Sequence, residues 1–190
     1  TFELALLEAF REKGYDITSE DIADKWVGYI PFAYTAEEIA LNHLRHGIYP
    51  PESGYVANPY REMIGAAMRA AICGALAPAN PRMAAELAWR DGCVSHHNNG
   101  ILAEVFNALI VSMAYVETDM QVILDKAMRM IPRDSEFYSV LAFACQACGQ
   151  SRDYRQAWEL CEEKYKEYNW VHAYPNLAAD VLQATALSAP

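Results

Sequence analysis

Basic clusters are missing from this sequence, and their absence argues against two classes of partner. The 190 residues include 15 lysines and arginines against 25 aspartates and glutamates, a formal net charge of −10 at pH 7. Nucleic-acid backbones and anionic membranes both attract clustered Lys and Arg side chains. We therefore expect neither a nucleic acid nor a membrane surface among the partners of this protein.

Long uninterrupted apolar runs are missing too. A membrane-spanning helix needs about 18 or more apolar residues, and the stretch that comes nearest, 63–79, has Arg69 at its centre. Its many Gly and Ala residues would let neighbouring helices approach closely. We predict that a helix over 59–77 is the central one, buried on most sides.

Paired cysteines are also scarce. The chain has five cysteines, an odd number, and four of them fall within helical patterns. This usage indicates buried thiols and a reducing compartment, which we take to be the cytoplasm. Cys145 and Cys148 have the spacing of half a zinc site, but no second pair and no nearby His completes it. We therefore interpret them as core thiols.

What the sequence does contain is helical periodicity along its whole length. Thr18 with Asp21, Thr35 with Glu38 and Thr118 with Gln121 resemble capping boxes, and Asn58-Pro59 and Asn80-Pro81 each place an N-cap residue before a proline. We predict helices over 1–13, 19–30, 35–46, 59–77, 81–94, 98–116, 119–130, 134–148, 153–168 and 174–187. Neither a repeat nor a linker divides the chain, so we predict one all-α domain over 1–190, an orthogonal multi-helix bundle.

A polar stretch over 91–100 interrupts two apolar helical patterns. Short connections between rigid helices often carry binding residues, and we select Ser95, His96 and Asn99 as pocket residues. A capped helix junction is the alternative for the same residues. A nucleophilic triad on Ser95 is disfavoured, because adjacent side chains on a turn rarely reach the required geometry.

Isolated charges mark a second feature. Arg69 and Glu104 are single charges within apolar stretches, and a buried charge requires a partner. Arg69 could pair with Glu104 or with Asp91, either as a structural ion pair or as the floor of a ligand pocket. By contrast, we assign the acidic pairs 37–38 and 162–163 to solvated helix faces.

The segment Trp170-Val-His172-Ala-Tyr174 joins two helices with aromatic rings and an imidazole. One interpretation is a packed corner. The other is a wall that stacks on a base or a sugar ring, which is a common use of exposed aromatic side chains.

Taken in order, these pieces resemble the ADP-ribosylglycohydrolase family. The specific part is the Gly65-x-x-Met68-Arg69 helix followed by Ser95-His96, and further matching segments are 1–7, 49–55, 58–69, 80–91, 94–101 and 170–172. The resemblance implies an all-α fold of that family's type. It also implies hydrolysis of the glycosidic bond at the ribose anomeric carbon of an ADP-ribosylated protein or a related ADP-ribose conjugate.

The resemblance further implies two divalent cations, usually magnesium or manganese, that orient the ribose and activate a water. In the family their ligands come from an early Asp-Asp-Thr motif and a late Asp-x-Asp-Thr/Cys motif. Thr1 matches the Thr of the early motif and is the metal ligand we predict. We expect the chain to be the central part of a longer protein, and in isolation to bind no magnesium and to lack hydrolase activity.

The site residues that this resemblance and the residue patterns together suggest come from five segments. Gly65 would allow close approach of the ligand to the backbone, although the family's Asn-Gly is replaced here by Met63-Ile64 before it. The other predicted substrate-binding residues are Glu52, Ser53, Ser95, His96, Asn99, Trp170 and His172.

Two alternatives remain open at this stage. A non-catalytic helical binding or scaffold module would keep the same fold and pocket. The other is a helical enzyme that uses Cys93 or the pair Cys145 and Cys148, and this hypothesis does not depend on the resemblance.

Overall fold

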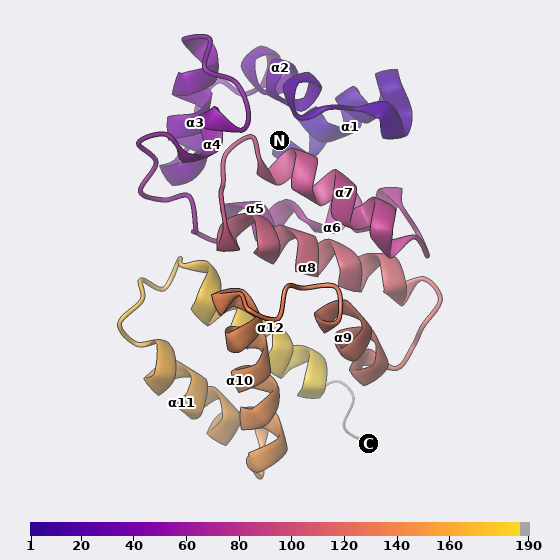
Figure 1. The fold of residues 1–190 in the computed structure, drawn as a ribbon, viewed down its shortest axis with the longest axis vertical. Coiled ribbons are helices and arrows are strands. Elements are labelled where there is room, and N and C mark those ends of the chain that lie inside the picture. Colours follow the sequence, from indigo (N-terminus) through magenta and orange to yellow (C-terminus); the bar gives the residue numbers. More distant parts are fainter. Residues whose placement is uncertain (187–190) are drawn as a thin grey trace.

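The structure, a computed structural model, describes residues 1–186 and is built from α-helices (Figure 1). The predicted all-α class is therefore confirmed. Residue 187, which we assigned to the last helix, lies outside the described residues. The helices are α1 (Phe2–Lys13), α2 (Ser19–Tyr29), α3 (Thr35–Arg45), α4 (Glu52–Tyr55), α5 (Gly65–Arg69), α6 (Ala71–Leu76), α7 (Pro81–Gly92), α8 (Asn99–Ala114), α9 (Met120–Met128), α10 (Glu136–Gln150), α11 (Tyr154–Tyr165) and α12 (Ala173–Ala186), with a 3₁₀ turn, η1 (Gly14–Asp16), after α1.

Helix α8 is the central element. Figure 1 shows it crossing the middle of the molecule, with α5, α6 and α7 packed on one side and α9, α10 and α12 on the other. Its sequence from Ile101 to Met113 is apolar apart from a few positions, and most of these side chains are buried. Burial of this helix on nearly all sides follows from its apolar character all round. Among the described residues, no helix is both long and apolar enough to cross a bilayer.

The predicted central helix 59–77 is wrong in both extent and place. Residues 59–64 form turns and, at Met63, an isolated antiparallel bridge to His172, and the helical part is divided into α5 and α6 at Ala70. Burial follows one stripe only, since Ala66 and Cys73 are buried whereas Met68 is 70% exposed.

Tertiary hydrogen bonds explain why 59–64 is not helical. The Asn58 side chain accepts from the Tyr60 amide and donates to the Gly54 and Ser95 carbonyls. Further on, the Ile64 amide donates to the Val171 carbonyl at 2.9 Å. Backbone groups paired in this way are not available for a helical ladder.

The helix starts follow the predicted caps in part. Thr18 and Asp21 form the expected capping box, and Asn80 accepts from the Met83 amide at 3.2 Å. The other two boxes are wrong: Thr35 is already the first residue of α3, and α9 is capped by Asp119. The Asp119 carboxylate accepts from two backbone amides of the first turn, so it takes the place we gave to Thr118.

Candidate functional site

A pocket of about 750 Å³ opens between segments that lie far apart in the sequence. Its volume is in the range of small-molecule and cofactor sites. Its walls are the start of α1, the connection between α2 and α3, the start of α5, and the segment before α12. Its lining residues are mostly apolar, and include Thr1, Phe2, Phe32, Tyr34, Glu37, Ile64, Gly65, Met68, Arg69, Trp170 and Val171.

Two acidic residues, Glu3 and Glu37, line the pocket, and the buried one is Glu37 of α3. The residue is only 7% exposed, and its Oε1 accepts a hydrogen bond from Arg69 Nη1 at 3.2 Å. Our assignment of the pair 37–38 to a solvated face is thus wrong for Glu37, although Glu38 is exposed. Burial raises the pKa of the Glu37 carboxyl, and the Arg69 charge opposes that rise.

Gly65 lies directly against this carboxyl. A Cβ at position 65 would come within 2.0 Å of Glu37 Oε1, a distance at which something must move. Gly65 lines the pocket as expected, but the group that approaches its backbone closely is Glu37. The absence of a side chain at 65 therefore sets the position of the acid.

Substitution of Gly65 by Ala tests this close fit. We expect Gly65→Ala to lower the free energy of unfolding by about 1–3 kcal/mol, because the added methyl group displaces a carboxyl that Arg69 holds in place. Urea denaturation measures the change. Gly28→Ala is the matched control: its Cβ would meet nothing within 4 Å, and replacing a helical glycine should stabilise by about 0.5–1 kcal/mol. A Gly65→Ala protein as stable as the wild type would contradict the fit.

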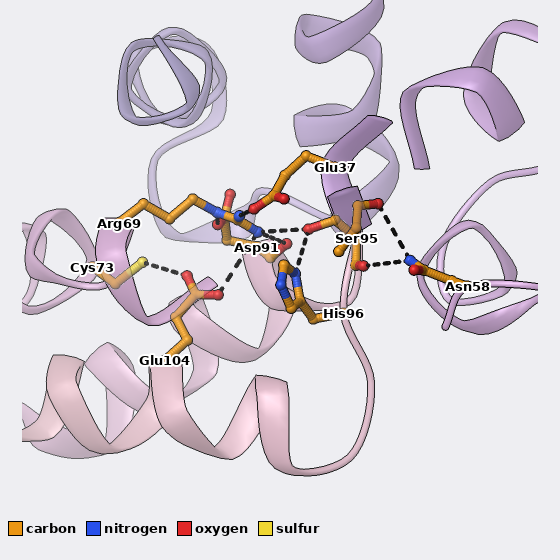
Figure 2. A network of polar contacts seen from close by, with 9 residues as sticks. Glu37, Asn58, Arg69, Cys73, Asp91, Ser95, His96 and Glu104 are labelled. Atoms are coloured by element: carbon orange, nitrogen blue, oxygen red, sulfur yellow. Dashed lines mark hydrogen bonds and ion pairs between the residues drawn. The ribbon is translucent and has the colours of Figure 1, made fainter. Parts of the chain in front are cut away.

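Arg69 links the pocket to a buried polar cluster behind its wall (Figure 2). Its guanidinium contacts Asp91 through Nε, donates to Ser95 Oγ at 3.0 Å, and lies 3.9 Å from Glu104 Oε2. Both partners that the sequence left open, Asp91 and Glu104, therefore contact Arg69, together with Glu37. The guanidinium also lies over the rings of Phe2 and Trp26.

Electrostatics inside this cluster follow from one cation among three carboxyl groups. Burial alone would lower the pKa of Arg69, but Asp91, Glu104 and Glu37 raise it above the usual value. Burial and the nearby Asp91 raise the pKa of Glu104 well above its ordinary value. For His96, burial and the Arg69 charge lower the pKa well below the ordinary value. A neutral Glu104 and a neutral imidazole are thus favoured beside the permanent charge of Arg69.

Three of the predicted site residues meet at the pocket. Thr1 and Gly65 contribute to its lining, and Trp170, which is 82% exposed, closes another side. They come from the start of α1, the start of α5 and the segment before α12. The structure thus brings together residues that are more than a hundred positions apart in the chain.

Two predicted residues lie behind the wall instead. Ser95 and His96 are buried, and Ser95 Oγ lies 2.8 Å from His96 Nδ1. Neither is among the residues that line the pocket. Arg69 connects this pair to the pocket wall, because its guanidinium donates to both Ser95 and Glu37 (Figure 2). Direct contact of Ser95 or His96 with a ligand stays a prediction, and their burial argues against it.

The four remaining predicted residues lie away from the pocket lining. Asn99 donates to Tyr174 Oη at 2.9 Å, and His172 accepts from the Tyr174 amide at 3.2 Å. Ser53 is buried and donates to the Val94 carbonyl, whereas Glu52 is exposed at the start of α4, a short helix in the loop we took to be irregular. None of the four lines the pocket, so their contact with substrate also stays a prediction.

The residues present do not fit a two-cation centre. Within residues 1–186, no three His, Cys, Asp or Glu side chains gather closely enough to hold a metal ion. Thr1 and Glu3 line the pocket, and the other lining carboxylate, Glu37, is already paired with Arg69. This set supplies fewer free oxygen ligands than magnesium needs.

The cysteines have the character of structural thiols. All five are free, and Cys73, Cys93 and Cys161 are buried. Burial raises the pKa of Cys93 to about 12 and that of Cys145 to about 11. Because the thiolate is the reactive form, these values weigh against the alternative of a cysteine-dependent enzyme.

Comparison with known proteins assigns the chain to a family. No curated protein and no solved structure matches the chain. The family model described as ADP-ribosylglycohydrolase, however, matches residues 1–189. The chain therefore belongs to the ADP-ribosylglycohydrolase family.

Proposed function

We propose that the 750 Å³ pocket binds the ADP-ribosyl group of a modified protein or of a related ADP-ribose conjugate. We propose further that the protein hydrolyses the glycosidic bond at the ribose anomeric carbon. The observation that carries this proposal is a buried acid, Glu37, on the wall of a ligand-sized pocket in a member of this family.

The form of the pocket supports a nucleotide-sugar ligand. Exposed rings of Phe32, Tyr34 and Trp170 line it, and such rings stack on bases and sugars. Gly65 leaves part of the wall without a side chain. An ADP-ribosyl group offers both a base to stack and hydroxyls to hydrogen-bond.

Glu37 is the residue we assign as general base. Its carboxylate takes a proton from the water that attacks the anomeric carbon, while the bond to the acceptor atom breaks and that atom is protonated from solvent at the pocket mouth. Burial, which raises the pKa, makes the carboxylate a stronger base. Arg69, 3.2 Å away, orients the carboxylate and favours its ionised form.

The family suggests the cofactor, and the free thiols suggest the cellular location. We propose magnesium as the cation, with the Thr1 hydroxyl at the pocket as a ligand. The five free cysteines support a reducing, cytoplasmic setting.

Calorimetry with ADP-ribose, with and without magnesium, tests the ligand. We expect Trp170→Ala to weaken binding by about tenfold, since a base stacked on an aromatic ring contributes about 1–3 kcal/mol. Trp89→Ala is the control, because Trp89 is exposed on α7 and does not line the pocket.

Each outcome of this experiment decides between the alternatives. Binding together with turnover of an ADP-ribosylated peptide by the full natural protein supports the proposal. Binding without turnover in that protein would favour the non-catalytic module. No binding by the wild type under either condition would refute the ligand assignment.

A further inference from the structure

A second pocket, of about 390 Å³, lies between α11 and α12, next to the first one. The two pockets share Trp170 and Asn176, so the exposed indole stands between them. The second pocket is lined by Trp158, Cys161, Glu162, Tyr165, Lys166, Tyr168, Trp170, Pro175, Asn176 and Ala179. None of the functions proposed above uses this space.

Aromatic rings dominate its walls. Trp158 and Trp170 are both exposed, and the Tyr165 and Tyr168 ring centroids lie 6.4 Å apart. The faces of such rings carry negative charge density and attract cations, most strongly in the case of Trp. Asn176 holds this arrangement, because its amide donates to the Trp170 carbonyl at 2.7 Å and to the His172 carbonyl at 2.9 Å.

The charges around these rings favour a positively charged occupant. Lys166 also lines the pocket, and its ammonium pairs with the Glu163 carboxylate at 2.6 Å, which offsets part of its charge. Among the described residues, Glu162 forms no ion pair, and it lines the pocket. Since the Asn176 amide hydrogens are both engaged, the pocket offers an acceptor, Glu162, together with ring faces. A ligand that donates hydrogen bonds and carries positive charge matches this set.

We propose that the second pocket binds a cationic side chain, guanidinium or ammonium, of the protein that bears the ADP-ribosyl group. The inference rests on the proposed function for the first pocket, because the shared Trp170 puts the two ligands side by side. The net charge of −10 attracts basic segments over longer range. The preferred substrates are therefore proteins with a basic residue near the modified one.

The test uses two small probes of nearly the same shape, of which only one is charged. N-acetyl-arginine methylamide and its neutral citrulline counterpart are titrated into the ¹⁵N-labelled protein, followed by NMR of the Trp158 and Trp170 indole signals. We expect the arginine probe to bind in the millimolar range and the citrulline probe at least fivefold more weakly. Glu162→Gln should weaken the arginine probe about fivefold, and Trp158→Ala about tenfold.

Glu159→Gln is the matched control, because it removes the same charge from the same helix at a residue outside the pocket lining. Equal binding of the two probes, or equal loss in Glu159→Gln and Glu162→Gln, would overturn the cation site. Adenosine binding at Trp158 in preference to the arginine probe would also overturn it. Failure of the function proposed for the first pocket is distinguishable, because the protein would then not bind ADP-ribose but would still bind the arginine probe.

Discussion

Substitution of Arg69 by methionine is expected to lower the free energy of unfolding by about 3–5 kcal/mol. The reason is that removal of one member of a buried ionic network leaves the others without compensation. Arg69 is buried and contacts Glu37, Asp91 and Glu104. Methionine keeps an apolar stem but lacks the guanidinium, so the loss reports mainly on the cation and its hydrogen bonds.

Urea denaturation at several pH values measures this effect. The pKa values of Glu37 and Glu104 are raised in the folded protein, most of all by burial. Such groups disfavour the folded state as the pH rises above their unfolded pKa values, and protonation at lower pH removes the cost. The penalty of Arg69→Met should therefore grow as the pH rises and shrink as it falls.

Arg82→Met is the matched control, since Arg82 is exposed and its one ion pair within residues 1–186 is with Glu86 on its own helix. Surface pairs of this kind contribute about 0.3–0.5 kcal/mol. A loss below 1 kcal/mol in Arg69→Met, or a loss that does not change with pH, would show that the cluster is not held by its single cation.

Substitution of Glu37 by glutamine is expected to reduce kcat of the full natural protein by about 10²–10⁴-fold, the usual contribution of a general base. Glutamine keeps the shape of the side chain but cannot accept the proton. The wild-type rate should rise with pH as Glu37 ionises, and its midpoint should lie above the ordinary range of a glutamate, because burial raises the pKa. The variant should lack this step.

Glu38→Gln is the control for this experiment, because Glu38 is the next residue on α3 but is exposed. Thermal unfolding of both variants separates a chemical defect from a folding defect. A Glu37→Gln protein that is folded and retains most of its activity would exclude Glu37 as the base.

The sequence predicts most of this fold, because helix formation depends largely on local signals. Apolar spacing and N-caps such as Thr18 and Asn80 act within a few residues. The segment 59–64 escaped prediction because its partners are distant: the Ile64 amide bonds the Val171 carbonyl, more than a hundred residues away. The spacing of residues in the sequence cannot predict such a long-range bond.

The site was predictable only in part. Thr1, Gly65 and Trp170 meet at the pocket, but Ser95 and His96 are buried, because Arg69 offers polar residues an interior partner. Glu37 was missed although a signal existed.

That signal is the pattern of positions 37, 40, 41 and 44 on α3, which has the spacing of one helix face. Ala40, Leu41 and Leu44 are apolar and buried, so Glu37 belongs to the inward stripe. A carboxylate in such a stripe indicates a buried cation opposite it. We assigned Glu37 to the solvated face because it stands next to a second glutamate, and did not consider its position on the helix.

The shared position of Trp170 has a consequence for selectivity. The Trp170 indole forms part of the walls of both pockets. A ligand that fixes its rotamer in one pocket therefore also changes the shape of the other. Thermodynamic linkage makes this effect reciprocal. If one ligand changes the affinity for the second by some factor, the second changes the affinity for the first by the same factor. A substrate protein that carries both the ADP-ribosyl group and the cationic side chain would then bind more tightly than the free nucleotide. The difference would come from avidity and not from a high affinity of either pocket alone.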